Sequence, residues 1–235
     1  MKKWQLAIFC VLTTAALCVP GRDTAMKVDA TVKLQEEIRY IALTFDDGPK
    51  EGTTDRLLDG LRERGAAATF FLVGDQAVLY PDLVRRMKEE GHQVGNHTWS
   101  HRRLVGDPLQ MQAEINKMDQ LLREILGEGE YWLRPPYGLI DETAAKQVTV
   151  PMVKWSVDPR DWESRSREKI TAAILGSVSP NSIVLLHDIY DASVDAALEV
   201  VDRLQEQGYW FVTVEELLRI NGIVPQAGEL YRSGA

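Results

Sequence analysis

The chain has 235 residues, of which 45% are hydrophobic and 26% are charged, and its formal net charge is −8. This composition is typical of a globular protein, and the length suits one α/β domain with a substantial core. The acidic balance argues against a nucleic-acid binder, or a protein that holds a polyanion by charge, because both need a basic surface.

The first 25 residues have the pattern of an export signal. Two lysines precede an apolar run, residues 4–19, which is shorter than the roughly 20 apolar residues that span a bilayer. An uncleaved N-terminal anchor is the alternative, and a lipoprotein signal is less favoured because Leu17, not a small residue, precedes Cys18. Cys10 and Cys18 are the only cysteines, and both lie within this segment. If the segment is removed on export, no cysteine remains, so we expect an exported domain without disulfides.

Seven short apolar runs follow a linker of residues 26–36 and predict strands, because each holds β-branched or aromatic residues between turn-forming residues. They are Ile38–Phe45, Ala68–Val73, His92–Asn96, Tyr131–Arg134, Met152–Val157, Ser182–His187 and Tyr209–Val214.

Segments with apolar residues at helical spacing lie between these runs. Four of them, around Leu58, Leu83, Met118 and Val201, are followed by a glycine that indicates the end of a helix: Gly65, Gly91, Gly127 and Gly208. This alternation predicts an α/β fold of about seven parallel strands, a deformed (β/α) barrel formed by residues 37–222 as a single domain. Residues 223–235 are predicted to be a loosely held tail.

Polar residues collect where the predicted strands end, which is the edge that carries the active site in a barrel of parallel strands. The first strand ends at Asp46 and Asp47, two adjacent carboxylates that repel each other unless a positive group lies nearby. A solvated turn is an equally good interpretation of this Asp-Asp-Gly-Pro segment taken alone.

Two histidines follow the third strand. His97 and His101 are four residues apart, so on a helical turn both imidazoles would face the same way and supply two ligands to a metal. Such a spacing also occurs by chance, but these are half of the four histidines in the chain. With a carboxylate from the first strand they would form a three-ligand site that leaves a position open for water.

The remaining strand ends carry further candidates. His187 ends an apolar strand and is placed for general acid catalysis, with a satisfied structural histidine as the alternative. Arg134 ends the fourth strand, and Asp161 and Trp162 follow the fifth. For either stretch alone, an arginine in a surface ion pair or a tryptophan that packs in the core is the simpler interpretation. His92 begins its strand, so it lies at the opposite edge and is interpreted as structural.

Five segments resemble, in order and spacing, the five motifs of the polysaccharide deacetylases with a NodB-homology domain, carbohydrate esterase family 4. They are Thr44–Pro49, His97–His101, Arg134–Gly138, Asp158–Trp162 and Leu185–Asp188, within a resemblance that covers roughly residues 38–220. It implies a deformed (β/α) barrel and metal-dependent removal of N-acetyl groups from amino-sugar polymers, or of O-acetyl groups from xylan.

The resemblance also implies a role for each matching residue. Asp46 would be the catalytic base and His187 the catalytic acid. Arg134 would orient Asp46, and Asp161 would pair with His187. The metal ligands would be Asp47, His97 and His101. The substrate would be bound by the backbone N–H of Tyr137 and, around the acetyl methyl, by Trp162 and Leu185.

The resemblance implies one divalent metal ion. Zinc is the expected ion, and cobalt, nickel and manganese are the alternatives. It would polarise the acetamide carbonyl and lower the pKa of bound water, from which Asp46 would take a proton. His187, kept cationic by Asp161, would then protonate the departing amine.

The stretches 187–191 and 208–214 look most like those of bacterial peptidoglycan-directed members. The expected substrate is therefore N-acetylglucosamine of peptidoglycan. The alternatives are a chitooligosaccharide deacetylase, an acetylxylan esterase, a catalytically silent glycan-binding protein and, last, a small-molecule amidohydrolase. We expect a monomer that is extracellular or associated with the cell wall. It would contact a membrane only through an uncleaved N-terminal segment, and no nucleic-acid partner is expected.

Overall fold

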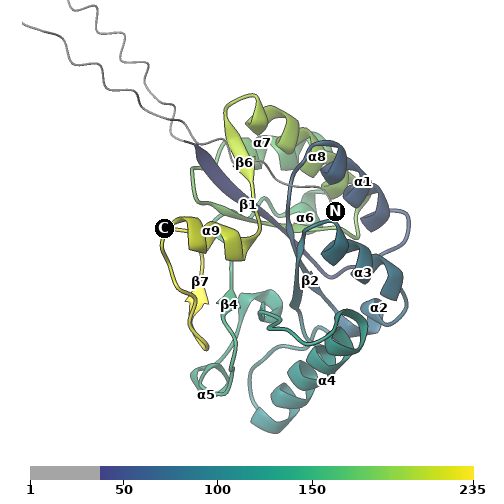
Figure 1. The fold of residues 1–235 in the computed structure, drawn as a ribbon, viewed down its shortest axis with the longest axis vertical. Coiled ribbons are helices and arrows are strands. Elements are labelled where there is room, and N and C mark those ends of the chain that lie inside the picture. Colours follow the sequence, from purple (N-terminus) through teal and green to yellow (C-terminus); the bar gives the residue numbers. More distant parts are fainter. Residues whose placement is uncertain (1–37) are drawn as a thin grey trace, which may run out of the picture. The chain divides into compact units, whose positions relative to one another are not determined.

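Parallel strands form the centre of the fold. The computed structural model describes residues 38–235. In it, β1 (Arg39–Asp46) lies between β2 (Thr69–Leu72) and β5 (Ile183–His187). β3 (Gln93–Asn96) pairs with β2, and β6 (Tyr209–Phe211) pairs with the first residues of β1. All of these pairings are parallel, which confirms the prediction from the strand–helix alternation (Figure 1).

Beyond β3 the barrel wall continues through single bridges, so it is deformed and incomplete there. Leu133 is bridged to Asn96 on one side and to Met152 on the other, and Val157 is bridged to Val184. The predicted strand Tyr131–Arg134 is therefore reduced to one bridged residue, and of Met152–Val157 only β4 (Met152–Val153) is a strand. Prolines at positions 135, 136 and 151 bound these segments, and a proline has no N–H to extend a ladder.

Helices cover the outside of the strands. The four expected helices are present as α1 (Thr54–Glu63), α3 (Pro81–Glu89), α4 (Pro108–Leu126) and α8 (Asp191–Gln205). The glycines predicted to end them all have positive φ. The sequence pattern did not reveal α7 (Arg167–Leu175), α9 (Val214–Ile220) or the single turns α2 (Gly74–Ala77), α5 (Glu142–Ala145) and α6 (Asp161–Ser164).

The C-terminal part corrects two expectations. The last predicted strand stops at Phe211, because Thr213 and Glu216 form a capping box that begins α9. The tail is packed rather than loosely held: β7 (Leu230–Tyr231) pairs in parallel with β4. Gly234 donates its N–H to the Asn181 carbonyl at 2.9 Å.

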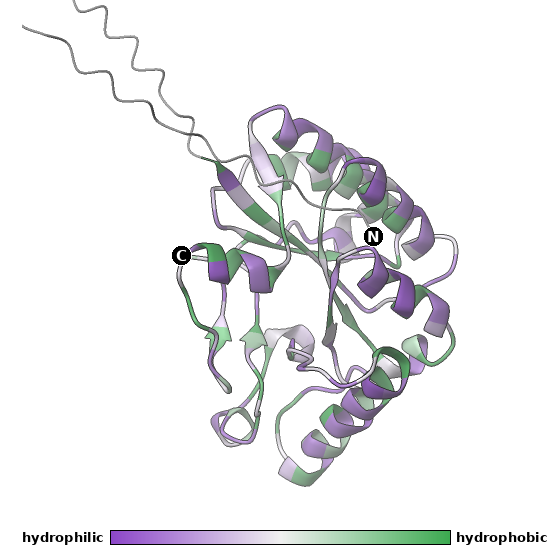
Figure 2. Ribbon diagram, in the orientation of Figure 1, coloured by the Kyte–Doolittle hydropathy of each residue, from purple (hydrophilic) through white to green (hydrophobic). Residues whose placement is uncertain are grey.

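The alternation of side chains along β1 separates the core from the functional face. Ile41, Leu43 and Phe45 belong to the main hydrophobic cluster, together with residues of α1, α3, α4, α7 and α8. Because successive strand residues point to opposite faces, Thr44 and Asp46 point away from these helices. Figure 2 shows the same division, with hydrophobic strands and hydrophilic outer surfaces on the helices.

The predicted export segment and linker, residues 1–36, lie outside the residues that the structure describes. Among residues 38–235, no helix has the length and apolar composition needed to cross a bilayer.

His92 lies just before β3, at the opposite end of the strands from the candidate site, and is 6% exposed. Its Nδ1 accepts the Ala68 N–H at 3.1 Å, so this nitrogen is unprotonated in the fold. Burial lowers the pKa of His92 from 6.5 to about 4. The fold therefore favours the neutral imidazole, and the stability gained in this way is complete above pH 6.5 and lost as the pH falls towards 4.

We expect replacement of His92 by glutamine, which keeps an acceptor, to flatten the acid side of the stability profile. Between pH 7 and 4.5 the native protein should lose about 2 kcal/mol more of its free energy of unfolding than the variant. Urea unfolding at both pH values measures this difference. Parallel profiles for the two proteins would contradict it.

Candidate active site

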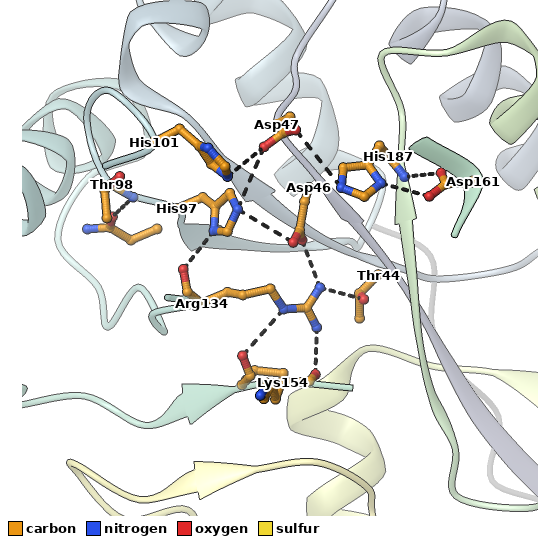
Figure 3. A network of polar contacts seen from close by, with 12 residues as sticks. Thr44, Asp46, Asp47, His97, Thr98, His101, Arg134, Lys154, Asp161 and His187 are labelled. Carbon is orange, nitrogen blue, oxygen red and sulfur yellow. Dashed lines mark hydrogen bonds and ion pairs between the residues drawn. The ribbon is translucent and has the colours of Figure 1, made fainter. Parts of the chain in front are cut away.

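Arg134 fixes Asp46 inside the barrel. The Arg134 side chain is fully buried, and its Nη1 donates to Asp46 Oδ1 and to Thr44 Oγ1, both at 2.7 Å (Figure 3). Its Nη2 donates to the Lys154 carbonyl at 2.8 Å, and its guanidinium lies 4.1 Å from the centre of the Phe71 ring. Burial lowers the pKa of Arg134, and the Asp46 carboxylate opposes this effect. The pair therefore holds one carboxylate in a single orientation at the end of β1.

Asp47, His97 and His101 converge beside it. Asp47 Oδ1 lies 3.4 Å from His101 Nε2 and 3.7 Å from His97 Nε2. The two histidines do not share a helical turn, as their spacing suggested; they lie in the loop after β3. Asp47 and His101 have positive φ, 74° and 57°, so an unusual backbone conformation, not a helix, brings the side chains together.

The hydrogen bond of His97 determines which nitrogen faces Asp47. Nδ1 donates to the Arg134 carbonyl at 2.6 Å, because a carbonyl can only accept. The proton is therefore on Nδ1, and Nε2 presents a free lone pair towards Asp47. Burial lowers the pKa of His97 despite the nearby carboxylates of Asp46 and Asp47, which also favours the neutral ring.

These three residues fit a divalent metal. Their donor atoms all lie within 4.8 Å of one another, and Asp47 Oδ1 is a buried carboxylate oxygen without a hydrogen-bond partner among the described residues. A buried oxygen of this kind is costly unless something positive binds it. Two imidazoles and one carboxylate are a donor set typical of zinc and similar ions in catalytic sites.

His187 ends β5 on the other side of Asp47, with its Nε2 4.0 Å from Asp47 Oδ2. Its Nδ1 pairs with Asp161 Oδ1 at 2.8 Å, and the fully buried Asp161 also accepts from the His187 N–H and from Ser193 Oγ. Burial disfavours the charged imidazole, but the hydrogen bond and charge of Asp161, with the charges of Asp46 and Asp47, outweigh it and raise the pKa of His187 to about 9.

A cavity of about 430 Å³ joins these groups. Eight of the ten candidate residues line it, and the other two, Arg134 and Asp161, bond to Asp46 and His187 behind its wall. Leu185 forms a buried part of the wall, whereas Tyr137 and Trp162 are about half exposed. The structure thus brings all the predicted residues together.

Four further residues complete the site. Trp155 and Asp158 line the cavity, and Thr44 and Ser193 bind Arg134 and Asp161. Thr44 lies two residues before Asp46 on the same strand, so the period of the strand could have identified it. Ser193 belongs to α8, and nothing in the sequence around it indicates a contact with Asp161.

A buried carboxylate held by an arginine, a histidine–aspartate pair and three convergent candidate metal donors thus lie at one edge of the parallel strands. The family model described as polysaccharide deacetylase matches residues 33–153. The chain is therefore a member of the polysaccharide deacetylase family.

Two curated relatives are deacetylases of peptidoglycan. The chain is 39% identical to peptidoglycan-N-acetylmuramic acid deacetylase PdaC of Bacillus subtilis over 76% of this chain and 38% of the relative. It is 37% identical to peptidoglycan-N-acetylglucosamine deacetylase PgdA of Listeria monocytogenes over 83% of this chain and 42% of the relative. The chain thus spans about two fifths of the length of each.

Solved structures agree on the fold. The structure of Bacillus subtilis PdaC matches with a TM-score of 0.77 at 37% identity, covering 79% of this chain and 93% of that one. A family 4 acetyl xylan esterase from Clostridium thermocellum, in complex with cobalt, matches with a TM-score of 0.78 at 30% identity, covering 83% of this chain and 98% of that one.

Proposed function

We propose that this chain removes N-acetyl groups from N-acetylglucosamine residues of peptidoglycan and releases acetate. The observation that carries the proposal is the order of groups across one cavity: a fixed carboxylate, three metal donors, and a histidine backed by a buried carboxylate. Hydrolysis of an amide needs a base for the water and an acid for the amine, one at each end of such a site.

Asp47, His97 and His101 would hold the metal, which we propose is zinc. When bound, the ion supplies a Lewis acid for the acetamide carbonyl and a more acidic water. Asp46 is the base in this proposal, because its Oδ1 is held by Arg134 while its Oδ2 lies 3.5 Å from His97 Nε2, beside the donors. The oxygen that faces the donors is thus the one that receives the proton from water.

His187 is the acid in this proposal. Asp161 occupies its Nδ1, so the proton on Nε2 is the one that faces the cavity and passes to the departing sugar nitrogen. Water thereby divides between the products, its hydroxyl going to acetate and its proton to the amine. The backbone N–H of Tyr137 would donate to the developing oxyanion, and Leu185 and Trp162 would enclose the acetyl methyl.

The choice of sugar rests on the relatives. One acts on N-acetylmuramic acid and the other on N-acetylglucosamine, both in peptidoglycan, so the polymer is better supported than the sugar. Neutral chitooligosaccharides and acetylated xylan are the polymers to compare. We further propose that the chain is exported by its N-terminal segment and acts as a monomer at the cell wall.

Incubation of the metal-replete protein with each polymer tests the proposal. We expect acetate from peptidoglycan, with new free amines located on glucosamine by mass spectrometry of a muramidase digest. Chelation should abolish the release, and added zinc should restore it. Free amines on muramic acid alone would correct the sugar, and acetate from none of the polymers would refute the proposed function.

A further inference from the structure

A second cavity adjoins the candidate active site and shares Asp47 and His101 with it. Its volume is about 510 Å³, and its wall includes Lys50 from the loop after β1, Arg165 after α6, and Tyr190 after β5. A polymer whose acetamide occupies the first cavity therefore meets this second cavity directly beside the metal donors.

Two cationic side chains line the second cavity without a carboxylate partner. Lys50 Nζ donates to the Ile189 carbonyl at 3.0 Å, and the Arg165 guanidinium lies 4.2 Å from the centre of the Tyr190 ring. No carboxylate oxygen of residues 38–235 lies within 4.0 Å of either charged group.

Two carboxylates also line this cavity, but neither forms an ion pair with Lys50 or Arg165. Asp47 faces the imidazoles, and Asp75 accepts from the Gln76 side-chain amide at 3.1 Å. Both positive charges of the second cavity therefore remain available to a ligand, because aromatic rings and carbonyls position them without neutralising them.

Several arginines on or beside the helices, in contrast, pair with neighbouring carboxylates. Examples are the pairs Arg64–Asp202, Arg86–Glu90, Arg123–Asp119 and Arg203–Glu199. In a chain with net charge −8, two cations without a carboxylate partner thus lie beside the candidate active site. Unpaired cations of this kind favour an anionic group of the bound partner over neutral competitors.

We propose that the Lys50–Arg165 cavity binds a carboxylate of the glycan next to the sugar that is deacetylated. This inference rests on the proposed function and specifies its substrate as acidic. In peptidoglycan the carboxylate has two chemical sources: the lactyl ether of muramic acid where the stem peptide has been removed, and the stem peptide itself where it is present. Neutral oligomers of N-acetylglucosamine have neither.

The test compares the double variant Lys50→Gln/Arg165→Gln with the matched variant Lys88→Gln/Arg219→Gln. Lys88 and Arg219 line a cavity at the opposite end of the strands, and Lys88 likewise donates to a carbonyl, that of Leu126 at 3.0 Å. Both double variants remove two positive charges, so a difference between them is local to the cavity.

Three substrates are assayed: glycan strands stripped of stem peptides, strands with stem peptides, and neutral N-acetylglucosamine oligomers. We divide kcat/KM for a carboxylate-bearing strand by kcat/KM for the neutral oligomer. This ratio should fall about tenfold in the Lys50→Gln/Arg165→Gln variant, as the loss of two partly exposed ion pairs predicts. The change should appear in KM. High salt should reduce the same ratio in the native protein, and the matched variant should keep it.

A fall on stripped strands alone assigns the lactyl carboxylate, and a fall on peptide-bearing strands alone assigns the stem. An unchanged ratio, or an equal fall in the matched variant, overturns this inference while leaving an active deacetylase. A native protein that releases no acetate from any glycan refutes the proposed function, and this inference with it.

Discussion

Replacement of Asp46 by asparagine should lower kcat by about 10²- to 10⁴-fold, the range that one general base contributes. The asparagine has nearly the same shape and keeps an oxygen for Arg134, but it cannot take a proton from water. Its metal content should match that of the native protein, because the donors are on Asp47, His97 and His101. Acetate release under saturating substrate and metal analysis of the same sample measure both quantities.

A matched control for this change is Asp82→Asn, an exposed aspartate on α3 that pairs with Arg85. It alters charge by the same amount away from the cavity, so kcat should stay at the native value. A native kcat in the Asp46 variant would contradict the assignment of the base. A loss of bound metal in that variant would instead place Asp46 among the ligands.

Replacement of Arg134 by leucine should reduce the free energy of unfolding by about 3–5 kcal/mol, as the loss of one partner of a buried ion pair does. The change leaves the Asp46 carboxylate, which is 3% exposed, without its charged partner. It also leaves the carbonyls of Val153 and Lys154 without the donors that join them to β1. Chemical denaturation at neutral pH measures the difference.

The matched variant is Arg203→Leu, which removes an exposed arginine that pairs with Glu199 one turn away on α8. Such helical pairs contribute only about 0.3–0.5 kcal/mol. A double variant, Arg134→Leu with Asp46→Leu, removes the unpaired charge and should recover part of the lost stability. Equal effects of the two arginine replacements would show that Arg134 is not the internal support described above.

The sequence was most informative where a strand is buried on both faces. β1, β2 and β5 have largely apolar runs, and their bounds agree with the prediction to within one residue at each end. Prediction failed where one strand contributes a single bridge, as at Leu133, because a pairing of one residue leaves no periodic pattern. The packed tail was missed for the same reason, since β7 has only two residues.

The candidate site followed from the ends of the strands rather than from any one motif. Asp46 and His187 were placed at the same edge because both follow buried strands, and the structure shows that they are register partners on neighbouring parallel strands. The loop from His97 to His101 was harder to predict, because Thr98 and His101 have positive φ values, which residues other than glycine adopt uncommonly. The link from Asp161 to Ser193 joins α6 to α8 and has no local signature.

Arg134 serves both halves of the site with different atoms. Its carbonyl accepts a hydrogen bond from the His97 Nδ1–H, and its guanidinium holds Asp46. The proposed base and one proposed metal ligand are therefore both positioned by the same residue, which Pro135 and Pro136 follow directly. A displacement of this segment, by substrate or by a distant substitution, would carry both groups in the same direction. The distance between Asp46 and His97 should therefore change little when the barrel wall moves slightly, although the wall is incomplete at this position.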